Sequence, residues 1–203
     1  IDGNLEGVKI AVDCANGSAS ATADMLFRGL NANALIINDE PDGTNINKDC
    51  GSTHIEQLAK FMKRHKCALG VAFDGDADRL AVCGRRLYHG DEILFNLTRF
   101  PFGGVVVGTL MTNSALERRL SAQGMRLLRT DVGDRNIAEV MRVTGARLGG
   151  EPSGHYIAGG VTGDGILSAA AVSLLAASDG LYTLACDAQA SADIPLLSGS
   201  PCR

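Results

Sequence analysis

The chain has few aromatic residues and no run of basic ones. Its 203 residues include no tryptophan, aromatic side chains make up 4%, and the net charge is −4. Proteins that bind nucleic acid usually follow the phosphate backbone with clustered Lys and Arg and stack bases on aromatic rings. We therefore expect no nucleic-acid partner.

The sequence also lacks long apolar runs and paired cysteines. No run approaches the roughly 20 apolar residues of a membrane-spanning helix, and the N-terminus has no signal-peptide pattern, so no membrane association is expected. The six cysteines are scattered without a C-x-x-C pair. This pattern predicts reduced, mostly buried thiols in a cytoplasmic protein rather than a disulfide framework or a zinc site. The chain begins at Ile1 without methionine, so we expect part of a longer protein.

Strand and helix patterns alternate along the chain. The first half predicts strands at 8–13, 32–38, 67–73 and 80–83, with helices at 19–30 and from 52 or 53 onward. The second half predicts strands at 105–111, 125–129, 146–149 and 156–158, with helices starting at 90 and at 115–122, 136–143 and 165–175. Alternation of this kind gives parallel strands with helical crossovers. The prediction is an α/β chain of two consecutive βαβαβ-type domains with mixed, mainly parallel sheets.

Two domains of about 100 residues each fit this length. The segment from Phe100 to Gly104 has the composition of a linker, which predicts domain limits at 1–102 and 103–180. Residues 181–203 are rich in serine, aspartate and proline and are expected to form a poorly defined tail.

Side-chain caps are expected at several helix starts, because a Ser or Thr oxygen can accept a free backbone N–H there. Ser18 or Ser20 is the candidate for the first helix, and Ser114 for the helix at 115–122. Thr53 and Glu56 have the spacing of a capping box.

Three carboxylates on alternate residues, Asp74, Asp76 and Asp78, follow the apolar run at 69–73. On an extended chain such side chains are roughly 6 to 7 Å apart, too far for one small ion, so the loop must curl, and Gly75 suits a curl. Clustered carboxylates repel unless a cation lies among them. Hard oxygen ligands favour magnesium, calcium or manganese over zinc, which predicts a divalent cation here, with Arg79 beside it to hold an anion.

Two other interpretations of this acidic loop, residues 74–79, can be compared with the sequence. An EF-hand needs glycine at its sixth position and glutamate at its twelfth, where this chain has Arg79 and Arg85, so that reading fails. A polar loop that caps a helix stays open as an alternative.

A second polar loop spans residues 150–155. Glu151, Ser153 and His155 offer an acceptor, a hydroxyl and an imidazole, flanked by Gly150 and Gly154, which permit a close backbone approach. These groups suit the recognition of sugar hydroxyls. A polar turn with a surface histidine is the alternative.

Together these motifs resemble the α-D-phosphohexomutase family. The acidic loop resembles the family's magnesium loop, usually DGDGDR, and residues 150–155 resemble its sugar-binding loop, usually GEQSGH. Further stretches at 13–17, 45–47, 50–53 and 132–135 resemble the bacterial phosphoglucosamine mutase branch. The resemblance extends to about Leu175 and covers the second and third of the family's four domains.

The resemblance implies interconversion of glucosamine 6-phosphate and glucosamine 1-phosphate through a phosphoserine and a bisphosphate, a step toward UDP-N-acetylglucosamine and cell-wall precursors. It implies Mg²⁺ on Asp74, Asp76 and Asp78. The other site residues that it implies have these roles: Arg79 orients the phosphoryl group, Glu151, Ser153, His155 and Arg135 bind the phosphosugar substrate, and His155 assists catalysis. The catalytic serine and a phosphate-binding loop belong to the family's first and fourth domains, which are missing from this chain. We therefore expect it to be inactive alone, and a homodimer is compatible with this reading.

Other functions stay open beside this one. A phosphomannomutase or phosphoglucomutase of the same family is the nearest. A haloacid-dehalogenase-like phosphatase also carries Asp-x-Asp after an apolar strand, but its loop normally continues with glycine and threonine, where this chain has Ala77 and Asp78. A non-catalytic metal-binding or scaffold module is a third class.

Three residues depart from the family pattern. Ala77 replaces the usual glycine of the acidic loop without removing a ligand, and Pro152 stiffens the 150–155 loop. Asp131 stands where many relatives have a lysine that faces a phosphate, so that contact is not carried over.

Overall fold

The computed structural model describes residues 3–159 and 162–187. Its first part contains β1 (Lys9–Asp13), α1 (Ala23–Gly29), β2 (Asn33–Ile37), α2 (Ile55–His65), β3 (Leu69–Phe73) and β4 (Leu80–Cys83). Its second part contains α3 (Gly90–Leu97), β5 (Val105–Thr109), α4 (Ser114–Ser121), β6 (Arg126–Thr130), α5 (Asp134–Thr144), β7 (Leu148–Gly150), β8 (Tyr156–Ala158) and α6 (Gly165–Ser178). Of the predicted tail, 188–203 lies outside the described residues.

The strands form two four-stranded sheets with the same topology, ordered β2-β1-β3-β4 and β6-β5-β7-β8. In each sheet the first three strands of the chain are parallel and the fourth is antiparallel. The central strands β1 and β3 are buried almost throughout, since helices cover both faces, whereas the edge strand β2 is largely half-buried. The predicted α/β class, with two βαβαβ-type units and mixed, mainly parallel sheets, is confirmed.

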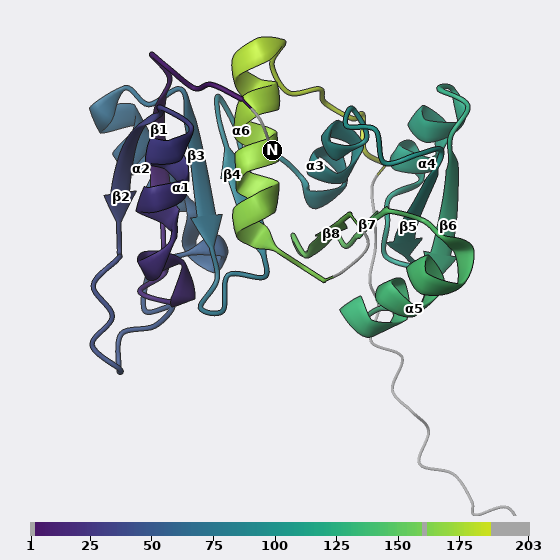
Figure 1. Ribbon diagram of the computed structural model, residues 1–203, viewed down its shortest axis with the longest axis horizontal. Coiled ribbons are helices and arrows are strands. Elements are labelled where there is room, and N and C mark those ends of the chain that lie inside the picture. Colours follow the sequence, from purple (N-terminus) through teal and green to yellow (C-terminus); the bar gives the residue numbers. More distant parts are fainter. Residues whose placement is uncertain (1–2, 160–161, 188–203) are drawn as a thin grey trace, which may run out of the picture.

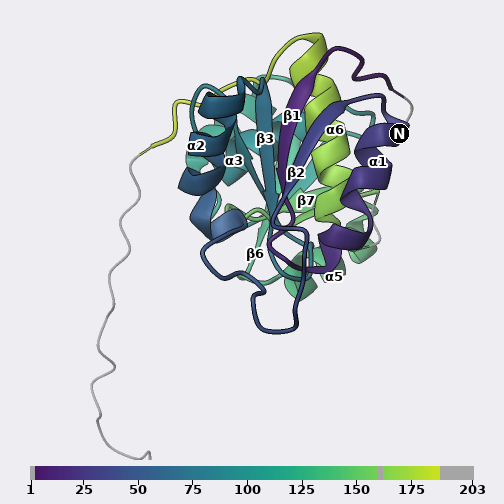
Figure 2. The ribbon, with the colours of Figure 1, turned by 90° about the vertical axis from the view of Figure 1, so that its left-hand side faces the viewer.

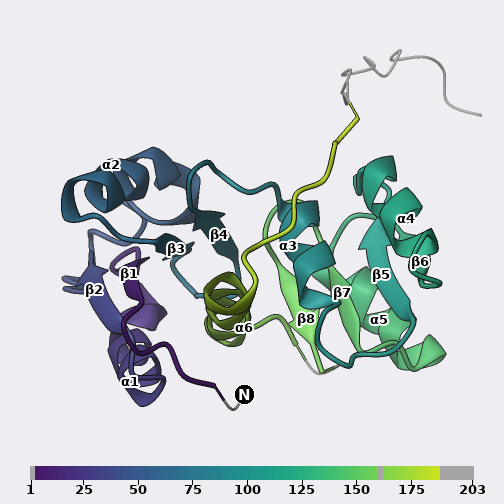
Figure 3. The same cartoon turned by 90° about the horizontal axis from the view of Figure 1, so that it is seen from above.

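The two units exchange one helix each. α1 and α6 cover one face of the first sheet and α2 covers the other (Figure 2). α3 and α4 lie on one face of the second sheet and α5 on the other (Figure 3). Thus α3 follows the first sheet in the chain but packs against the second, and α6 follows the second but packs against the first (Figure 1). No single boundary in the sequence therefore divides the chain into two units that each keep the helices packed on their sheet. The domain limits 1–102 and 103–180 stay a prediction.

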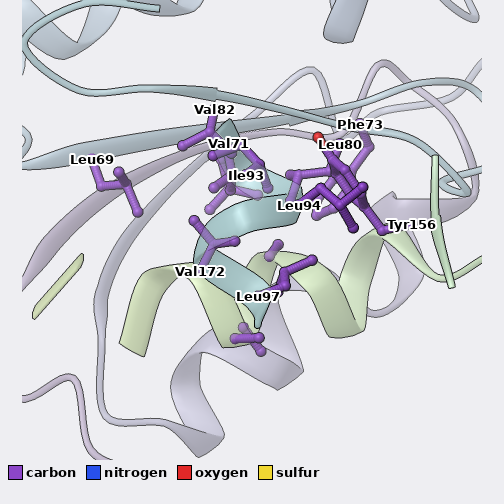
Figure 4. Close-up of a cluster of buried hydrophobic side chains, with 14 of the residues drawn as sticks. Leu69, Val71, Phe73, Leu80, Val82, Ile93, Leu94, Leu97, Tyr156 and Val172 are labelled. Carbon is purple, nitrogen blue, oxygen red and sulfur yellow. The ribbon is translucent and has the colours of Figure 1, made fainter. Parts of the chain in front are cut away.

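The exchanged helices join both units in one hydrophobic core. Buried side chains from β3, β4, α3, α6 and β8 contribute to it (Figure 4): Leu69, Val71, Phe73, Leu80, Val82, Ile93, Leu94, Leu97, Tyr156 and Val172. Burying one such aliphatic or aromatic side chain contributes about 1.5–3 kcal/mol. The Tyr156 hydroxyl also donates to the Gly90 carbonyl oxygen at 3.0 Å, which ties β8 to the start of α3.

Helix α4 is capped one residue earlier than predicted. Asn113 has extended backbone angles, and its side chain accepts the Ala115 N–H at 3.0 Å. Ser114 is already the first helical residue, so the prediction that it caps the helix is wrong. A capping box that the sequence analysis missed lies at the start of α3, between His89 and Glu92.

The other predicted caps are not formed. Short 3₁₀ turns at Ser18–Ala21 and Ser52–His54 precede α1 and α2. They move the cap positions to Thr22 and His54, and neither side chain makes a capping hydrogen bond. The expected roles of Ser18 or Ser20, and of Thr53 with Glu56, were therefore wrong.

After α6 the chain runs without regular structure along α3 toward the start of α4 (Figure 3). The Tyr182 N–H donates to Asn96 Oδ1 at 2.8 Å, and Asn96 Nδ2 donates back to the Tyr182 carbonyl at 2.9 Å. The Leu184 N–H donates to Glu92 Oε1 at 2.8 Å. This part of the predicted tail is therefore held by α3 side chains.

Across residues 3–159 and 162–187, no helix is both long and apolar enough to cross a membrane. The cysteines of this part are free thiols, of which Cys14, Cys50 and Cys83 are buried, and Cys186 is exposed. Cys202 lies outside the described residues.

Candidate functional site

The acidic loop leaves β3 at the carboxyl edge of the first sheet and curls as predicted. One carboxylate oxygen from each of Asp74, Asp76 and Asp78 lies within 4.8 Å of the others. The Arg79 N–H donates to Asp74 Oδ1 at 3.1 Å, which closes the turn. The alternative of a helix-capping loop is not what the structure shows, because this loop leads into β4.

The curl does not depend on the backbone freedom of Gly75, as the sequence had suggested. Among residues 74–79, the one with a left-handed backbone is Ala77, at φ 62°. A Cβ at Gly75 would lie 2.6 Å from Ile46 Cδ1 and 2.8 Å from Asn47 Nδ2, so these two side-chain ends would have to move to admit a larger residue. Ala77 therefore carries strain that a glycine would not.

Three glycines from other segments press against the acidic loop and its exit. A Cβ at Gly17 would lie 2.2 Å from the Gly75 carbonyl oxygen, and one at Gly165 would lie 2.7 Å from that of Ala77. The Gly165 N–H donates to that Ala77 oxygen at 3.0 Å. At Gly154 a Cβ would lie 2.4 Å from the Leu80 oxygen. The loop is thus fixed by close backbone contacts on several sides.

Asp13, at the end of β1, holds together two segments beside the acidic loop and was missed as a site residue. Its fully buried carboxylate accepts the Ala15 N–H and the Gly51 N–H, each at 2.9 Å. It thereby joins the 13–17 and 50–53 stretches that the sequence analysis singled out, and Gly17 in the first packs on Gly75. A lone acid at the end of an apolar strand was the available signal.

The electrostatics of the loop favour a cation. Burial raises the pKa of Asp74, and the nearby Asp78 and Asp76 charges raise it further, against the opposing Arg79 N–H. The Arg79 guanidinium Nε is 3.7 Å from Asp74 Oδ2, one positive charge beside three carboxylates. Asp78 Oδ1 is buried without a hydrogen-bond partner among the described residues. An all-oxygen cluster with an unpaired buried oxygen fits a hard divalent cation.

In the 150–155 loop, Glu151 and Ser153 are brought together. The Gly133 N–H donates to Glu151 Oε1 at 2.8 Å, and the Ser153 hydroxyl donates to Glu151 Oε2 at 3.2 Å. A cavity of about 210 Å³ lies beside them and is lined by Thr109, Met111, Val132, Glu151, Pro152 and Ser153. Arg135 follows Gly133 and is exposed, with no ion pair among the described residues.

The two loops meet. The Leu80 N–H donates to the Gly154 carbonyl at 2.9 Å, and Arg79 and His155 form an antiparallel bridge. His155 Nδ1 lies 3.1 Å from Asp78 Oδ2. His155 is only 5% exposed, so the alternative of a surface histidine does not hold.

Replacing Gly154 with alanine is expected to lower the free energy of unfolding by about 2 kcal/mol, because it adds left-handed strain and a clash with Leu80. Gly145→Ala is the matched control, since Gly145 also has a positive φ but no atom within 4 Å of an added Cβ. Urea unfolding of both variants separates the two terms. Equal losses would show that the clash with Leu80 costs nothing and that the two loops are not packed as closely as the structure has them.

Comparison with known proteins places both halves in one family. Residues 3–88 match the model of phosphoglucomutase/phosphomannomutase, alpha/beta/alpha domain II, and residues 89–189 match domain III of the same family. A phosphoglucosamine mutase of Rhodospirillum rubrum is 46% identical over 186 residues, which cover 86% of this chain and 41% of the relative. The chain therefore spans about two fifths of that relative's length.

Solved structures agree on the fold. A phosphoglucomutase/phosphomannomutase family protein of Burkholderia thailandensis superposes with a TM-score of 0.75 at 28% identity, over 87% of this chain and 41% of that one. The N-acetylphosphoglucosamine mutase of Aspergillus fumigatus, in complex with GlcNAc-6P and magnesium, gives a TM-score of 0.67 at 19% identity, over 87% and 44% of the two chains. With both family models matched in order along nearly the whole sequence, the chain belongs to the phosphoglucomutase/phosphomannomutase family and covers its second and third domains.

Proposed function

We propose that this chain provides the metal-binding and sugar-binding domains of a cytoplasmic phosphoglucosamine mutase. The enzyme would interconvert glucosamine 6-phosphate and glucosamine 1-phosphate through a phosphoserine and a bisphosphate. The observation that carries the proposal is the contact between the acidic loop and the 150–155 loop, where Asp78 and His155 lie 3.1 Å apart. A cation and a sugar would then be held side by side, as phosphoryl transfer to a sugar hydroxyl requires.

We propose Mg²⁺ as the cation, held by Asp74, Asp76 and Asp78. Among the described residues the ligand cluster consists of three carboxylates with no nitrogen or sulfur ligand, which favours Mg²⁺ over zinc, and the Aspergillus relative was solved with magnesium. When bound, the ion would neutralise negative charge on the phosphoryl oxygens. Arg79, half exposed beside Asp74, would orient the phosphoryl group through its guanidinium.

The substrate-binding roles follow from exposure and hydrogen-bonding capacity. Glu151 and Ser153 line a cavity and offer acceptors to ring hydroxyls, while Gly133 holds Glu151 in place. Arg135 is exposed and lies two residues after Gly133, whose N–H holds Glu151. We assign it to the substrate phosphate. His155 is assigned an assisting role. The phosphoserine and the phosphate loop are assigned to the family's first and fourth domains, and a homodimer stays a prediction.

The proposal is tested by titrating the chain with sugar phosphates in the presence of Mg²⁺. We expect glucosamine 6-phosphate to bind more tightly than mannose 6-phosphate. We expect Glu151→Gln to weaken its binding about 10-fold, because a charge-assisted hydrogen bond is lost. Glu139→Gln is the control, since Glu139 is an exposed glutamate on α5 paired with Arg142.

Three outcomes would contradict the proposal or one of its parts. Beryllium fluoride trapped on Asp74 would favour a haloacid-dehalogenase-like phosphatase, because that class forms an aspartyl phosphate there. Tighter binding of mannose 6-phosphate or glucose 6-phosphate would favour the phosphomannomutase or phosphoglucomutase reading. Sustained turnover by this chain alone would contradict the assignment of the phosphoserine to another domain.

A further inference from the structure

His155 is enclosed rather than open to a substrate. Its side chain is 6% exposed, and a Cβ added at Gly163 would lie 2.1 Å from its Nε2 atom. That Nε2 atom is buried and has no hydrogen-bond partner among the described residues. The polar contact that remains to the imidazole runs from Nδ1 to Asp78 Oδ2, at 3.1 Å.

This contact determines which oxygen of Asp78 is free. Oδ2 faces the imidazole, so Oδ1 is the oxygen left for a cation, and Oδ1 is buried without a partner in the described part of the chain. A carboxylate can rotate about its Cβ–Cγ bond, and a neighbour that holds one oxygen fixes the direction of the other. Partners of metal ligands act in this way and affect metal affinity strongly.

The imidazole is itself held at the junction of the two loops. Backbone pairing between Arg79 and His155, with the bond from Leu80 to Gly154, places the two segments in register. The backbone of His155 therefore cannot move relative to the acidic loop without breaking this pairing.

We propose that His155 is a positioning residue for Asp78, so that the 150–155 loop sets the metal affinity of the acidic loop. The inference rests on the proposed function in taking the acidic loop as the metal site. It differs from a direct role in catalysis, because the imidazole acts through the Asp78 carboxylate. A ligand that shifts the 150–155 loop would change metal affinity, and metal would change the affinity for that ligand by the same factor.

Two amide variants test the proposal by Mn²⁺ binding to the chain, measured by calorimetry. The side-chain nitrogen of asparagine can occupy the position of His Nδ1, whereas that of glutamine reaches the position of Nε2. We expect His155→Asn to keep Mn²⁺ affinity within about threefold of wild type and His155→Gln to lose about 10- to 100-fold. Urea unfolding of both variants checks that they are folded equally well.

A second measurement needs no variant. In wild-type protein with ¹⁵N-labelled histidine, long-range proton–nitrogen spectra should show the proton of the His155 ring on Nδ1, and Mg²⁺ should shift that nitrogen. Equal Mn²⁺ affinities for the two amide variants, or a proton on Nε2 with Nδ1 unprotonated, would overturn the inference. A wild-type chain that binds no Mn²⁺ would instead refute the proposed metal site, and this inference with it.

Discussion

Replacing Arg86 with alanine is expected to lower the free energy of unfolding by about 3 kcal/mol at pH 7.5. Arg86 makes two hydrogen bonds to Glu92, at 2.8 and 2.6 Å, and the Glu92 side chain is only 2% exposed. Without Arg86, a buried carboxylate loses its counter-charge, which typically costs 3–5 kcal/mol. Arg86 is itself 46% exposed, so we place the loss at the lower end.

The pH dependence of this loss gives a second readout. Burial by itself would raise the pKa of Glu92, but the hydrogen bonds from Arg86, Leu184 and His89 outweigh it, so the pKa is lowered. In wild type, the stability from Glu92 is therefore present above its unfolded pKa and lost as pH falls through the folded pKa. In Arg86→Ala, burial is no longer outweighed and the folded pKa should rise, so acid should protonate Glu92 and remove the penalty. The difference between the proteins should shrink from pH 8 to pH 5.

Two further variants test whether the loss of stability comes from the Arg86–Glu92 ion pair. Arg85 is the adjacent exposed arginine without an ion pair among the described residues, so Arg85→Ala should change the unfolding free energy by less than about 0.5 kcal/mol. The double variant Arg86→Ala with Glu92→Gln should be more stable than Arg86→Ala alone, because no buried charge is left. A double variant that is less stable than Arg86→Ala would contradict the argument.

Local patterns in the sequence were sufficient for the fold class, because each β-α-β unit buries its own alternating apolar residues. They did not reveal the helix exchange, which depends on contacts far apart in the chain. A signal was present in the sequence of α6, which has no charged residue, since a helix that is small or apolar on every side is usually enclosed.

The site was predictable to a similar extent. The acidic residues and the polar residues of the 150–155 loop are close in sequence, so short motifs identify them. The support that Asp13 gives is not local, because its carboxylate accepts the Gly51 N–H from a distant part of the chain. A hydrogen bond across such separations leaves no spacing pattern, and neither does the contact of Asp78 with His155. The prediction that Gly75 supplies the unusual backbone angle of the acidic loop was wrong, because the left-handed residue there is Ala77.

Asp76→Asn is expected to be more stable than wild type without metal and less stable than wild type with saturating Mg²⁺. Without metal, the variant should be slightly more stable than wild type, because Asp76 is one of the charges that raise the pKa of Asp74. With Mg²⁺ at 100 times its dissociation constant, wild type should gain about 2.7 kcal/mol. If the lost ligand weakens binding about 100-fold, the variant should gain only about 0.4 kcal/mol at the same concentration.

The measurement is urea unfolding of both proteins in EDTA and in Mg²⁺, with Glu40→Gln as a control of equal charge change at an exposed acid outside the loop. The control should gain as much from Mg²⁺ as wild type, because it removes no ligand. A general effect of ionic strength would stabilise all three proteins alike, and that result would count against a metal site. The inversion specifically requires that the carboxylate which repels its neighbours in the metal-free chain is also the one that binds the ion.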